Sequence, residues 1–207
     1  EKSPTMNIIG SSGKDPGRWE KRYLESDIPW DTGKPDPFLK AYMKRVGSIP
    51  QKVLEIGCGT GTNAVWLSQQ GCTVVALDLS PKAVSIAQRK AEKSGADCQI
   101  IAADFLVDAI AGGPFDLVYD RAVFHVFDTP QERTLFAQRV ANHLREGGVW
   151  HSLSGSTDGP PRETGPPRRS AQEIMAAIEP YFEVASLISD NFDEERHAGA
   201  RAWVLTA

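Results

Sequence analysis

The sequence predicts an α/β domain with a mostly parallel, seven-stranded sheet, helices on both faces and an antiparallel hairpin at its C-terminal edge. Two observations predict the parallel part. Short apolar runs alternate with segments of helical periodicity, and several of those segments begin with a capping residue and a proline. A third observation predicts the hairpin, because the last two strand-like runs follow each other without a helix between them. One strand of such a hairpin must run antiparallel to the others, and we expect it at the sheet edge.

Seven short runs are predicted to form the strands. The second run, which starts at Thr73, is almost entirely β-branched or apolar, as expected for a parallel strand that is buried on both faces. The seven runs are residues 53–56, 73–79, 98–102, 115–119, 149–153, 182–188 and 202–206.

The helices are predicted from their capping residues and from apolar residues at helical spacing. Ser80 supplies an N-cap before Pro81. Thr129 and Ser170 each begin a capping box, with a glutamate three residues later. Helices are expected at residues 63–70, from residue 81 onward, at 130–144 and at 171–180.

Length and composition are consistent with one such domain. The chain has 207 residues, of which 41% are hydrophobic and 24% are charged, and a chain of this size can bury a sizeable core. We expect residues 1–50 to form an N-terminal helical lid segment of this domain. Its two short helices flank an irregular stretch, residues 28–35, that could fold over a ligand. Residues 51–207 are expected to form the ligand-binding domain itself.

Charge and cysteine content exclude several classes of function as first hypotheses. The net charge of −4 gives no overall attraction to nucleic acid or to anionic lipid. The longest apolar runs are about five residues, against the roughly 20 that a membrane-spanning helix needs. Cys58, Cys72 and Cys98 form neither a CxxC pair nor a zinc-binding spacing. We therefore expect no metal site and three reduced thiols in a cytoplasmic protein.

A glycine-rich loop follows the first predicted strand. Its sequence is Glu55-Ile56-Gly57-Cys58-Gly59-Thr60-Gly61. Glycines in such a loop adopt positive φ and let a ligand approach the backbone. Ligands of open α/β sheets bind at the carboxyl ends of the strands, which is where this loop lies. Asp78 ends the second strand, and its carboxylate would accept hydrogen bonds from ribose hydroxyls there.

The spacing of the glycines indicates which nucleoside binds. A dinucleotide-binding loop reads GxGxxG and seats a pyrophosphate on a helix N-terminus, whereas here the third glycine comes one residue early. Glu55 precedes the first glycine by two residues. Its charge would repel a pyrophosphate and would suit a ligand with a cationic amine. The loop resembles the E/DxGxGxG motif of class I S-adenosylmethionine-dependent methyltransferases, which have a Rossmann-like fold.

Further motifs of that family follow in order along the chain. Residues 74–78 resemble its ribose-binding motif, residues 103–105 its adenine-contacting motif, and residues 115–120 the fourth-strand motif that faces the methyl group. The resemblance covers residues 50–155 and implies S-adenosylmethionine as cofactor, with S-adenosylhomocysteine as product. The residues expected to bind the cofactor within this range are Glu55, Gly57, Cys58, Gly59, Gly61, Asp78, Leu79, Asp104, Phe105 and Asp120. Trp30, which precedes the range, is a further candidate because its ring could stack over the cofactor.

A narrower resemblance points to the thiopurine and thiol S-methyltransferase group. Residues 28–35 are similar to that group's N-terminal lid, residues 120–122 to its Asp-Arg-Gly sequence, and residues 165–167 to its Gly-Pro-Pro loop. The chain departs from the group at Ala122 and at His125. It also departs at three arginines around the prolines, which are Arg162, Arg168 and Arg169. The resemblance implies a thiol or another soft nucleophile as the methyl acceptor.

Three residues are candidates for the acceptor side of the reaction: His125, Arg121 and Asp120. His125 could be a general base for a thiol or hydroxyl, or a packed histidine in a short turn. Arg121 could position the acceptor through charge-assisted hydrogen bonds, or form an ion pair with Asp120. Trp30 could stack over the cofactor or acceptor, or anchor the N-terminal segment, and Tyr23 is expected to pack in the core.

The sequence therefore predicts methyl transfer from S-adenosylmethionine to a small-molecule acceptor, by a monomer or homodimer without a nucleic-acid or membrane partner. Transfer to a thiolate needs little acid–base help, so positioning is expected to supply most of the rate. The alternatives are an O- or N-methyltransferase with His125 as general base, a catalytically silent cofactor-binding module, a methyltransferase of RNA or protein, and a dehydrogenase. The acidic net charge disfavours a macromolecular substrate, and the glycine spacing disfavours a dehydrogenase.

Overall fold

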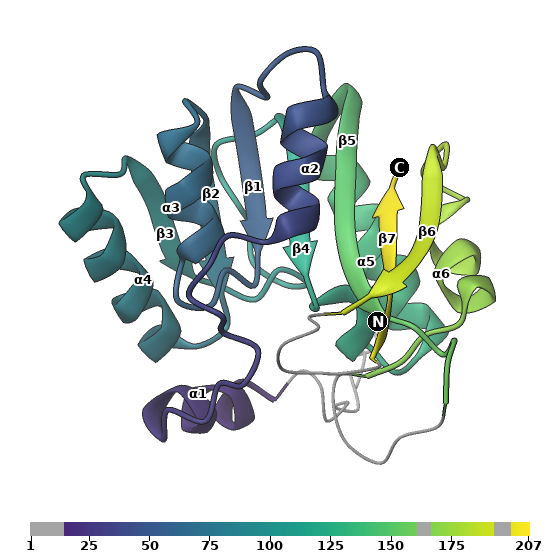
Figure 1. The fold of residues 1–207 in the computed structure, drawn as a ribbon, viewed down its shortest axis with the longest axis horizontal. Coiled ribbons are helices and arrows are strands. Elements are labelled where there is room, and N and C mark those ends of the chain that lie inside the picture. Colours follow the sequence, from purple (N-terminus) through teal and green to yellow (C-terminus); the bar gives the residue numbers. More distant parts are fainter. Residues whose placement is uncertain (1–14, 161–166, 193–199) are drawn as a thin grey trace, which may run out of the picture.

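The computed structural model describes residues 15–160, 167–192 and 200–207, which form the α/β fold that the sequence predicts (Figure 1). One sheet of seven strands has the order β3-β2-β1-β4-β5-β7-β6. The strands are β1 (Lys52–Ile56), β2 (Thr73–Asp78), β3 (Cys98–Ala102), β4 (Phe115–Arg121), β5 (Leu144–Gly155), β6 (Ser186–Asn191) and β7 (Arg201–Thr206). The helices are α1 (Pro16–Leu24), α2 (Pro37–Arg45), α3 (Thr62–Gln69), α4 (Pro81–Ser94), α5 (Pro130–His143) and α6 (Ala171–Ile178), with a short 3₁₀ helix, η1 (Phe124–Val126), after β4.

The first five strands pair in parallel, and β6 and β7 form the predicted hairpin. The antiparallel strand is expected at the edge of the sheet. It is β7, which lies one position inside the edge because it pairs with both β5 and β6. Composition accounts for the difference. β7 buries most of its side chains, whereas β6 exposes Ile188 and Asp190, and an edge strand tolerates exposed residues better than an interior strand does.

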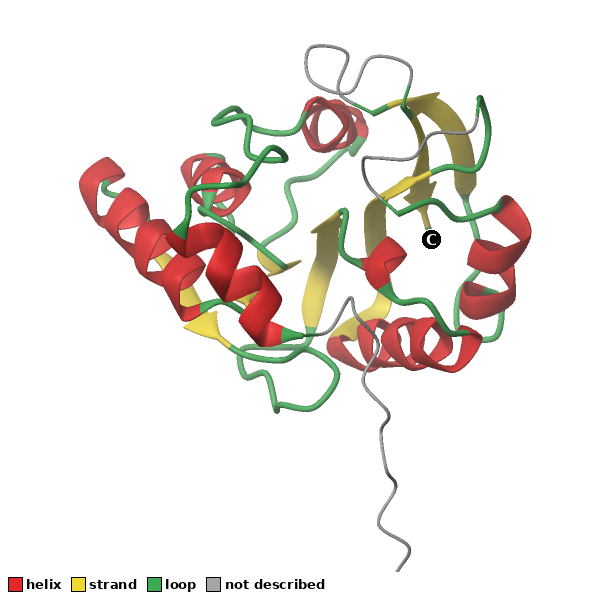
Figure 2. Ribbon diagram, turned by 90° about the horizontal axis from the view of Figure 1, so that it is seen from below, coloured by secondary structure: helices red, strands yellow, loops and turns green. Residues whose placement is uncertain are grey.

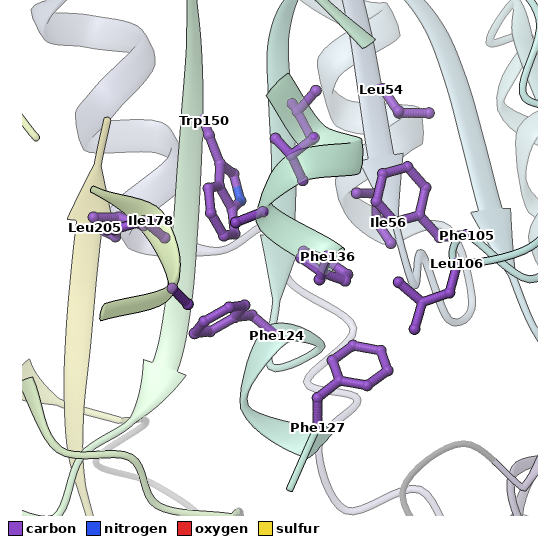
Figure 3. Close-up of a cluster of buried hydrophobic side chains, with 14 of the residues drawn as sticks. Leu54, Ile56, Phe105, Leu106, Phe124, Phe127, Phe136, Trp150, Ile178 and Leu205 are labelled. Carbon is purple, nitrogen blue, oxygen red and sulfur yellow. The ribbon is translucent and has the colours of Figure 1, made fainter. Parts of the chain in front are cut away.

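Alternate residues of each strand enter two separate cores. In β1, Leu54 and Ile56 pack on the side of α5 and α6, and Val53 packs on the side of α2, α3 and α4, so each face of the sheet is covered by its own helices (Figure 1). The α5 side is rich in aromatic residues. Phe136 lies 5.8 Å from Phe124 and 5.7 Å from Trp150 between ring centroids (Figure 3). This rigid cluster supports the turn after β4.

Two strands begin several residues away from their predicted starts. β5 begins directly after α5 and continues through the glycine pair at 147–148, where a loop is expected. The register with β4 shifts there, and Arg145 on the extended strand is ion-paired with Asp116 of β4. β6 begins later than expected, at Ser186, and the preceding Phe182 and Val184 pack against the aromatic core.

The carboxyl ends of β1, β2 and β4 all point toward α1, which lies across this end of the molecule (Figures 1 and 2). No helix connects β3 to β4. Phe105, Leu106 and Ile110 of that connection cover the core in its place. Within the described ranges no helix is long and apolar enough to cross a membrane. The fold therefore leaves one end of the sheet enclosed by loops and by α1.

Close packing of α3 on α4 provides a test of the fold. Gly61, directly before α3, has a φ of +79°, and a Cβ there would lie 2.7 Å from Cβ of Ala87 in α4. We expect Gly61→Ala to lower the free energy of unfolding by about 2–4 kcal/mol, from backbone strain and steric overlap together. Urea denaturation followed by circular dichroism measures this loss.

The matched control is Gly71→Ala. Gly71 also has a positive φ, of +95°, but a Cβ there would have no neighbour within 4 Å. Gly71→Ala should lower the free energy of unfolding only by the cost of backbone strain, about 1–2 kcal/mol. Equal losses in the two variants would contradict a packing role for Gly61.

Candidate active site

A cavity of about 780 Å³ lies at the carboxyl ends of the strands. Its walls come from α1 and the segment after it, from the glycine-rich loop, from the ends of β2 and β4, and from the loop after β3. Most of the predicted site residues line this cavity: Trp30, Glu55, Gly57, Cys58, Gly59, Asp78, Leu79, Asp104, Phe105, Arg121 and His125. The topology thus brings together motifs that are separated by up to a hundred residues of sequence, roughly the span expected for successive βα units.

Asp78 ends β2, and backbone N–H groups hold its carboxylate in place. One oxygen accepts a hydrogen bond from the N–H of Gly59 and the other from the N–H of Ser80, both at 2.9 Å. Burial raises the pKa of Asp78, and these hydrogen bonds oppose the rise. Each carboxylate oxygen can accept more than one hydrogen bond, so Asp78 can also accept from the two hydroxyls of a ribose.

Glu55 lies near the end of β1 and is only 2% exposed. Its Oε2 is buried without a hydrogen-bond partner among the described residues. Burial raises the pKa of Glu55 to about 8, although the side chain of Asn63 opposes the rise by hydrogen bonding. An unsatisfied buried oxygen costs free energy. A cationic amine in the cavity would supply both the missing donors and the balancing charge.

Tyr23 of α1 is a site residue that the sequence analysis assigns to the core. It is buried and lines the cavity. Its phenol oxygen accepts a hydrogen bond of 3.2 Å from Nε1 of Trp30, and a Cβ at Gly59 would lie 2.9 Å from the same oxygen. Burial and the charge of Asp78 raise the pKa of Tyr23, so the phenol stays protonated. The spacing of Trp19 and Tyr23 on one helical face is the available signal, but core packing produces the same spacing.

Residues 28–36 are tied to the glycine-rich loop and to α3 by two hydrogen bonds. Oγ1 of Thr60 donates to the carboxylate of Asp31 at 2.8 Å, and the backbone N–H of Asp36 donates to Oδ1 of Asn63 at 2.8 Å. Trp30 lies between these two attachments and lines the cavity. Trp30 is therefore anchored through the segment and lies where it could contact a bound ligand.

Two predicted site residues, Asp120 and Gly61, do not line the cavity. Asp120 is fully buried, and its carboxylate accepts hydrogen bonds from the N–H groups of Val123 and Phe124 and from Nε1 of Trp150. These hydrogen bonds hold the turn after β4 in place. Gly61 packs against α4. Asp120 supports the turn after β4, and Gly61 allows the glycine-rich loop to pack closely on α4.

Arg121 lines the cavity, and its ion-pair partner is Asp36 of the N-terminal segment rather than Asp120. The Nε of Arg121 lies 2.9 Å from Oδ2 of Asp36, with side-chain exposures of 16% and 2%. Nη1 of Arg121 also donates to the backbone carbonyl of Trp30 at 3.3 Å. The guanidinium lies 5.5 Å from the ring centroid of Phe192. The cation predicted for the acceptor side therefore has its own counter-ion.

His125 lines the cavity from η1 and is buried. The backbone N–H of Gly155 donates to Nδ1 of His125 at 2.8 Å, and the ring stacks on Phe192 with a centroid distance of 6.2 Å. Because Nδ1 accepts this hydrogen bond, the proton of the neutral ring is on Nε2. A general base needs a lone pair directed at the acceptor. In this tautomer the only ring lone pair is directed at Gly155.

The predicted loop at residues 165–167 is described only in part. Pro167 lines the cavity, whereas the first two residues of the loop, and Arg162, lie outside the described residues. Arg168 donates to backbone carbonyls, and Arg169 is ion-paired with acidic side chains. Both guanidinium groups are therefore already bound within the protein.

The cavity and the fold define a class of enzyme. The sheet order, the buried acids at the ends of β1 and β2, and the glycine-rich loop are those of a class I S-adenosylmethionine-dependent methyltransferase. The unsatisfied oxygen of Glu55 fits the cationic amine of that cofactor, and Asp78 fits its ribose. The chain belongs to the thiopurine S-methyltransferase family, whose model matches residues 14–204. S-Adenosylmethionine is therefore its methyl donor.

Related proteins include methyltransferases of small molecules. Probable thiol methyltransferase 2 of Arabidopsis thaliana is 34% identical over 190 residues, which cover 89% of this chain and 80% of that protein. A 2-heptyl-1-hydroxyquinolin-4(1H)-one methyltransferase of Mycobacteroides abscessus is 28% identical, over 78% of this chain and 71% of that protein. A solved structure described as the conversion of a disulfide bond into a thioacetal group during echinomycin biosynthesis has a TM-score of 0.77 at 26% identity, covering 92% of this chain and 90% of that one.

Asp78 provides the first test of this site. We expect Asp78→Ala to raise the Kd for S-adenosylhomocysteine more than about tenfold, or roughly 1.4 kcal/mol, because two ribose hydroxyls lose their acceptor. Isothermal titration calorimetry measures the change. Asp97→Ala removes an exposed carboxylate remote from the cavity and serves as the control. Unchanged affinity in Asp78→Ala would contradict the ribose assignment.

Glu55 provides a test through pH. Its pKa is about 8 in the folded protein against an ordinary value of 4.5, so the folded state holds the proton more tightly. The stability that this proton contributes is complete below pH 4.5 and is lost as pH rises through 8. Glu55→Gln cannot lose a proton. Between pH 5 and pH 8 we expect the wild type to lose roughly 2–4 kcal/mol relative to Glu55→Gln, measured by urea denaturation. Parallel stability curves for the two proteins would show that Glu55 ionises normally.

Proposed function

We propose that the chain transfers the methyl group of S-adenosylmethionine to the sulfur of a small thiol or to another soft nucleophile. The hydrogen bond that Nδ1 of His125 accepts from Gly155 is the observation that carries this proposal. Because of this bond, the one imidazole described in the cavity wall presents no basic lone pair to an acceptor. A thiol ionises near neutral pH without strong help, whereas an alcohol or phenol depends more on a general base.

The comparisons support the same acceptor class. One relative is named as a probable thiol methyltransferase, and the structural neighbour at 26% identity is described by a conversion of a disulfide bond. Sulfur is thus the acceptor element that both of these proteins suggest. The thiopurine S-methyltransferase family model points the same way.

Different residues of the cavity orient the cofactor, exclude water and position the acceptor. When bound, S-adenosylmethionine supplies a reactive methyl group on a cationic sulfur. Asp78 and Glu55 orient the two ends of the cofactor on either side of the reacting centre. The aromatic walls Trp30 and Phe127 exclude water from it. Arg121, with its charge balanced by Asp36, offers the acceptor a hydrogen-bond donor at a fixed position.

Oxygen is the second candidate acceptor atom. The relative from Mycobacteroides abscessus is named for a substrate that carries a hydroxyl group. Methylation at oxygen or nitrogen by this chain would use His125 as the base. Its Nδ1 would then have to leave the N–H of Gly155, or Nε2 would have to lose its proton to Nδ1. Either change would leave a buried backbone N–H unsatisfied, which is costly.

An acceptor panel tests the proposed function. Thiols, phenols, a hydroxyquinolone, heterocyclic amines and hydrogen sulfide are each incubated with the enzyme, and release of S-adenosylhomocysteine is measured. We expect thiols to be the preferred class. Turnover of phenols with inert thiols would overturn the thiol assignment and leave the methyltransferase class intact. Binding of S-adenosylhomocysteine without turnover of any acceptor would favour the catalytically silent alternative.

His125→Asn separates the two roles of the histidine. The amide oxygen of asparagine can take the place of Nδ1 and accept from Gly155, but the amide cannot act as a base. We expect thiol transfer to stay within about fivefold of the wild type, measured as kcat/KM. A loss of two to four orders of magnitude, as general-base catalysis would predict, would contradict the proposal.

Arg121→Ala is expected to affect thiol transfer more strongly. It removes the donor at the acceptor side and leaves Asp36 as an unpaired buried carboxylate. We expect kcat/KM to fall by one to two orders of magnitude, roughly 1.4–2.7 kcal/mol. A greater loss in His125→Asn than in Arg121→Ala would reverse the assignment of roles.

A further inference from the structure

The charges around the acceptor end of the cavity are paired within the protein. We define this end by Arg121, His125, Phe127, Asp128 and Phe192, which line the cavity beyond the cofactor-binding loop. Three of these residues are aromatic rings or an imidazole whose Nδ1 is already bonded. The other two are charged, and each has a partner of opposite charge just outside the cavity wall.

The pairing of Arg121 is the more buried of the two. Its partner Asp36 is 3% exposed and does not line the cavity, so an acceptor would meet the guanidinium but not the carboxylate. Asp36 is held rigidly, because Oδ1 caps α2 by accepting from Phe38 and Leu39 at 2.9 and 3.0 Å. Oδ2, the other oxygen, is the one that pairs with Arg121. Asp36 therefore cannot turn away when an acceptor arrives.

Asp128 shows the opposite arrangement of signs. Here the carboxylate lines the cavity, and its cation, Arg169, lies 2.7 Å behind it. Three further cations line the lid side of the cavity. Arg22 is ion-paired with Asp27, and the other two are Arg18 and Lys34. Both are exposed to solvent, which screens their charge. The buried part of the acceptor end thus has no cation without its own acid among the described residues.

We propose that the acceptor end selects uncharged thiols over thiols that carry a carboxylate, and that Asp36 determines this selectivity by neutralising Arg121. The proposal rests on the proposed function for the acceptor class. Burying a carboxylate in this cavity would strip its hydration, and only an unbalanced cation could offset that cost. The charge of Arg121 is already balanced by Asp36. An uncharged aromatic or alkyl thiol loses no such hydration and gains contact with the rings.

The test compares 4-methylbenzenethiol with 4-mercaptobenzoate, which differ in one para substituent. In the wild type we expect kcat/KM to favour the uncharged thiol at least tenfold. In Asp36→Asn the asparagine can still cap α2, but Arg121 loses its counter-ion. The preference should then fall at least fivefold toward the carboxylate. Asp36→Asn with Arg121→Gln removes both charges and should restore the wild-type preference.

Controls separate local charge from other effects. Asp116→Asn removes one negative charge from a different ion pair, with Arg145 at the opposite end of the strands, and should leave the preference unchanged. Arg121→Gln alone leaves the carboxylate of Asp36 unbalanced, so it should increase the preference for the uncharged thiol. It also provides an independent result if Asp36→Asn does not fold.

A wild-type preference below threefold, or a preference that Asp36→Asn leaves unchanged, would overturn the proposal. Failure of the proposed function would give a different result. In that case neither thiol would release S-adenosylhomocysteine. The same two thiols are then titrated into the complex with S-adenosylhomocysteine by calorimetry, and the ratio of their Kd values measures charge selectivity without turnover.

Discussion

The burial of two carboxyl groups at the ends of neighbouring strands is the constraint on which the rest of the site depends. Glu55 and Asp78 lie at the ends of β1 and β2, which pair in parallel. Burial raises the pKa of both because a poorly solvated environment disfavours the charged form. The glycine-rich loop compensates by giving a backbone N–H of Gly59 to Asp78. One oxygen of Glu55 has no hydrogen-bond partner among the described residues, and a cationic amine could supply the missing donor.

The N-terminal segment completes the site from residues that are distant in sequence. Glu20 on α1 accepts hydrogen bonds from Oγ of Ser80 and from the N–H of Lys82 at the start of α4. The stretch after α1 is bound to the glycine-rich loop through Asp31, and Asp36 is bound to both α3 and β4. The same segment therefore contacts the glycine-rich loop, the start of α4 and the end of β4. Enclosure of this kind strengthens every electrostatic interaction inside the cavity.

Much of the fold and of the cofactor site could be predicted because their signals are local. β-Branched runs, capping boxes and glycine spacing each lie within a few residues of one another. Tyr23 and Asp36 escape prediction because their roles depend on distant partners, such as Arg121, which is 85 residues from Asp36. The motif at Asp120 gives a position at the strand end but not the direction of the side chain, which turns toward Trp150. The placement of β7 likewise depends on which of the two last strands tolerates exposure.

The central claim is that this cavity binds S-adenosylmethionine with its amine at Glu55 and its ribose at Asp78. A crystal structure of the complex with S-adenosylhomocysteine tests it most directly. We expect ribose hydroxyls within hydrogen-bond distance of the Asp78 carboxylate, the ammonium group beside Oε2 of Glu55, and the sulfur facing Arg121 and His125. A nucleoside bound in the reverse orientation, or outside the cavity, would contradict the account.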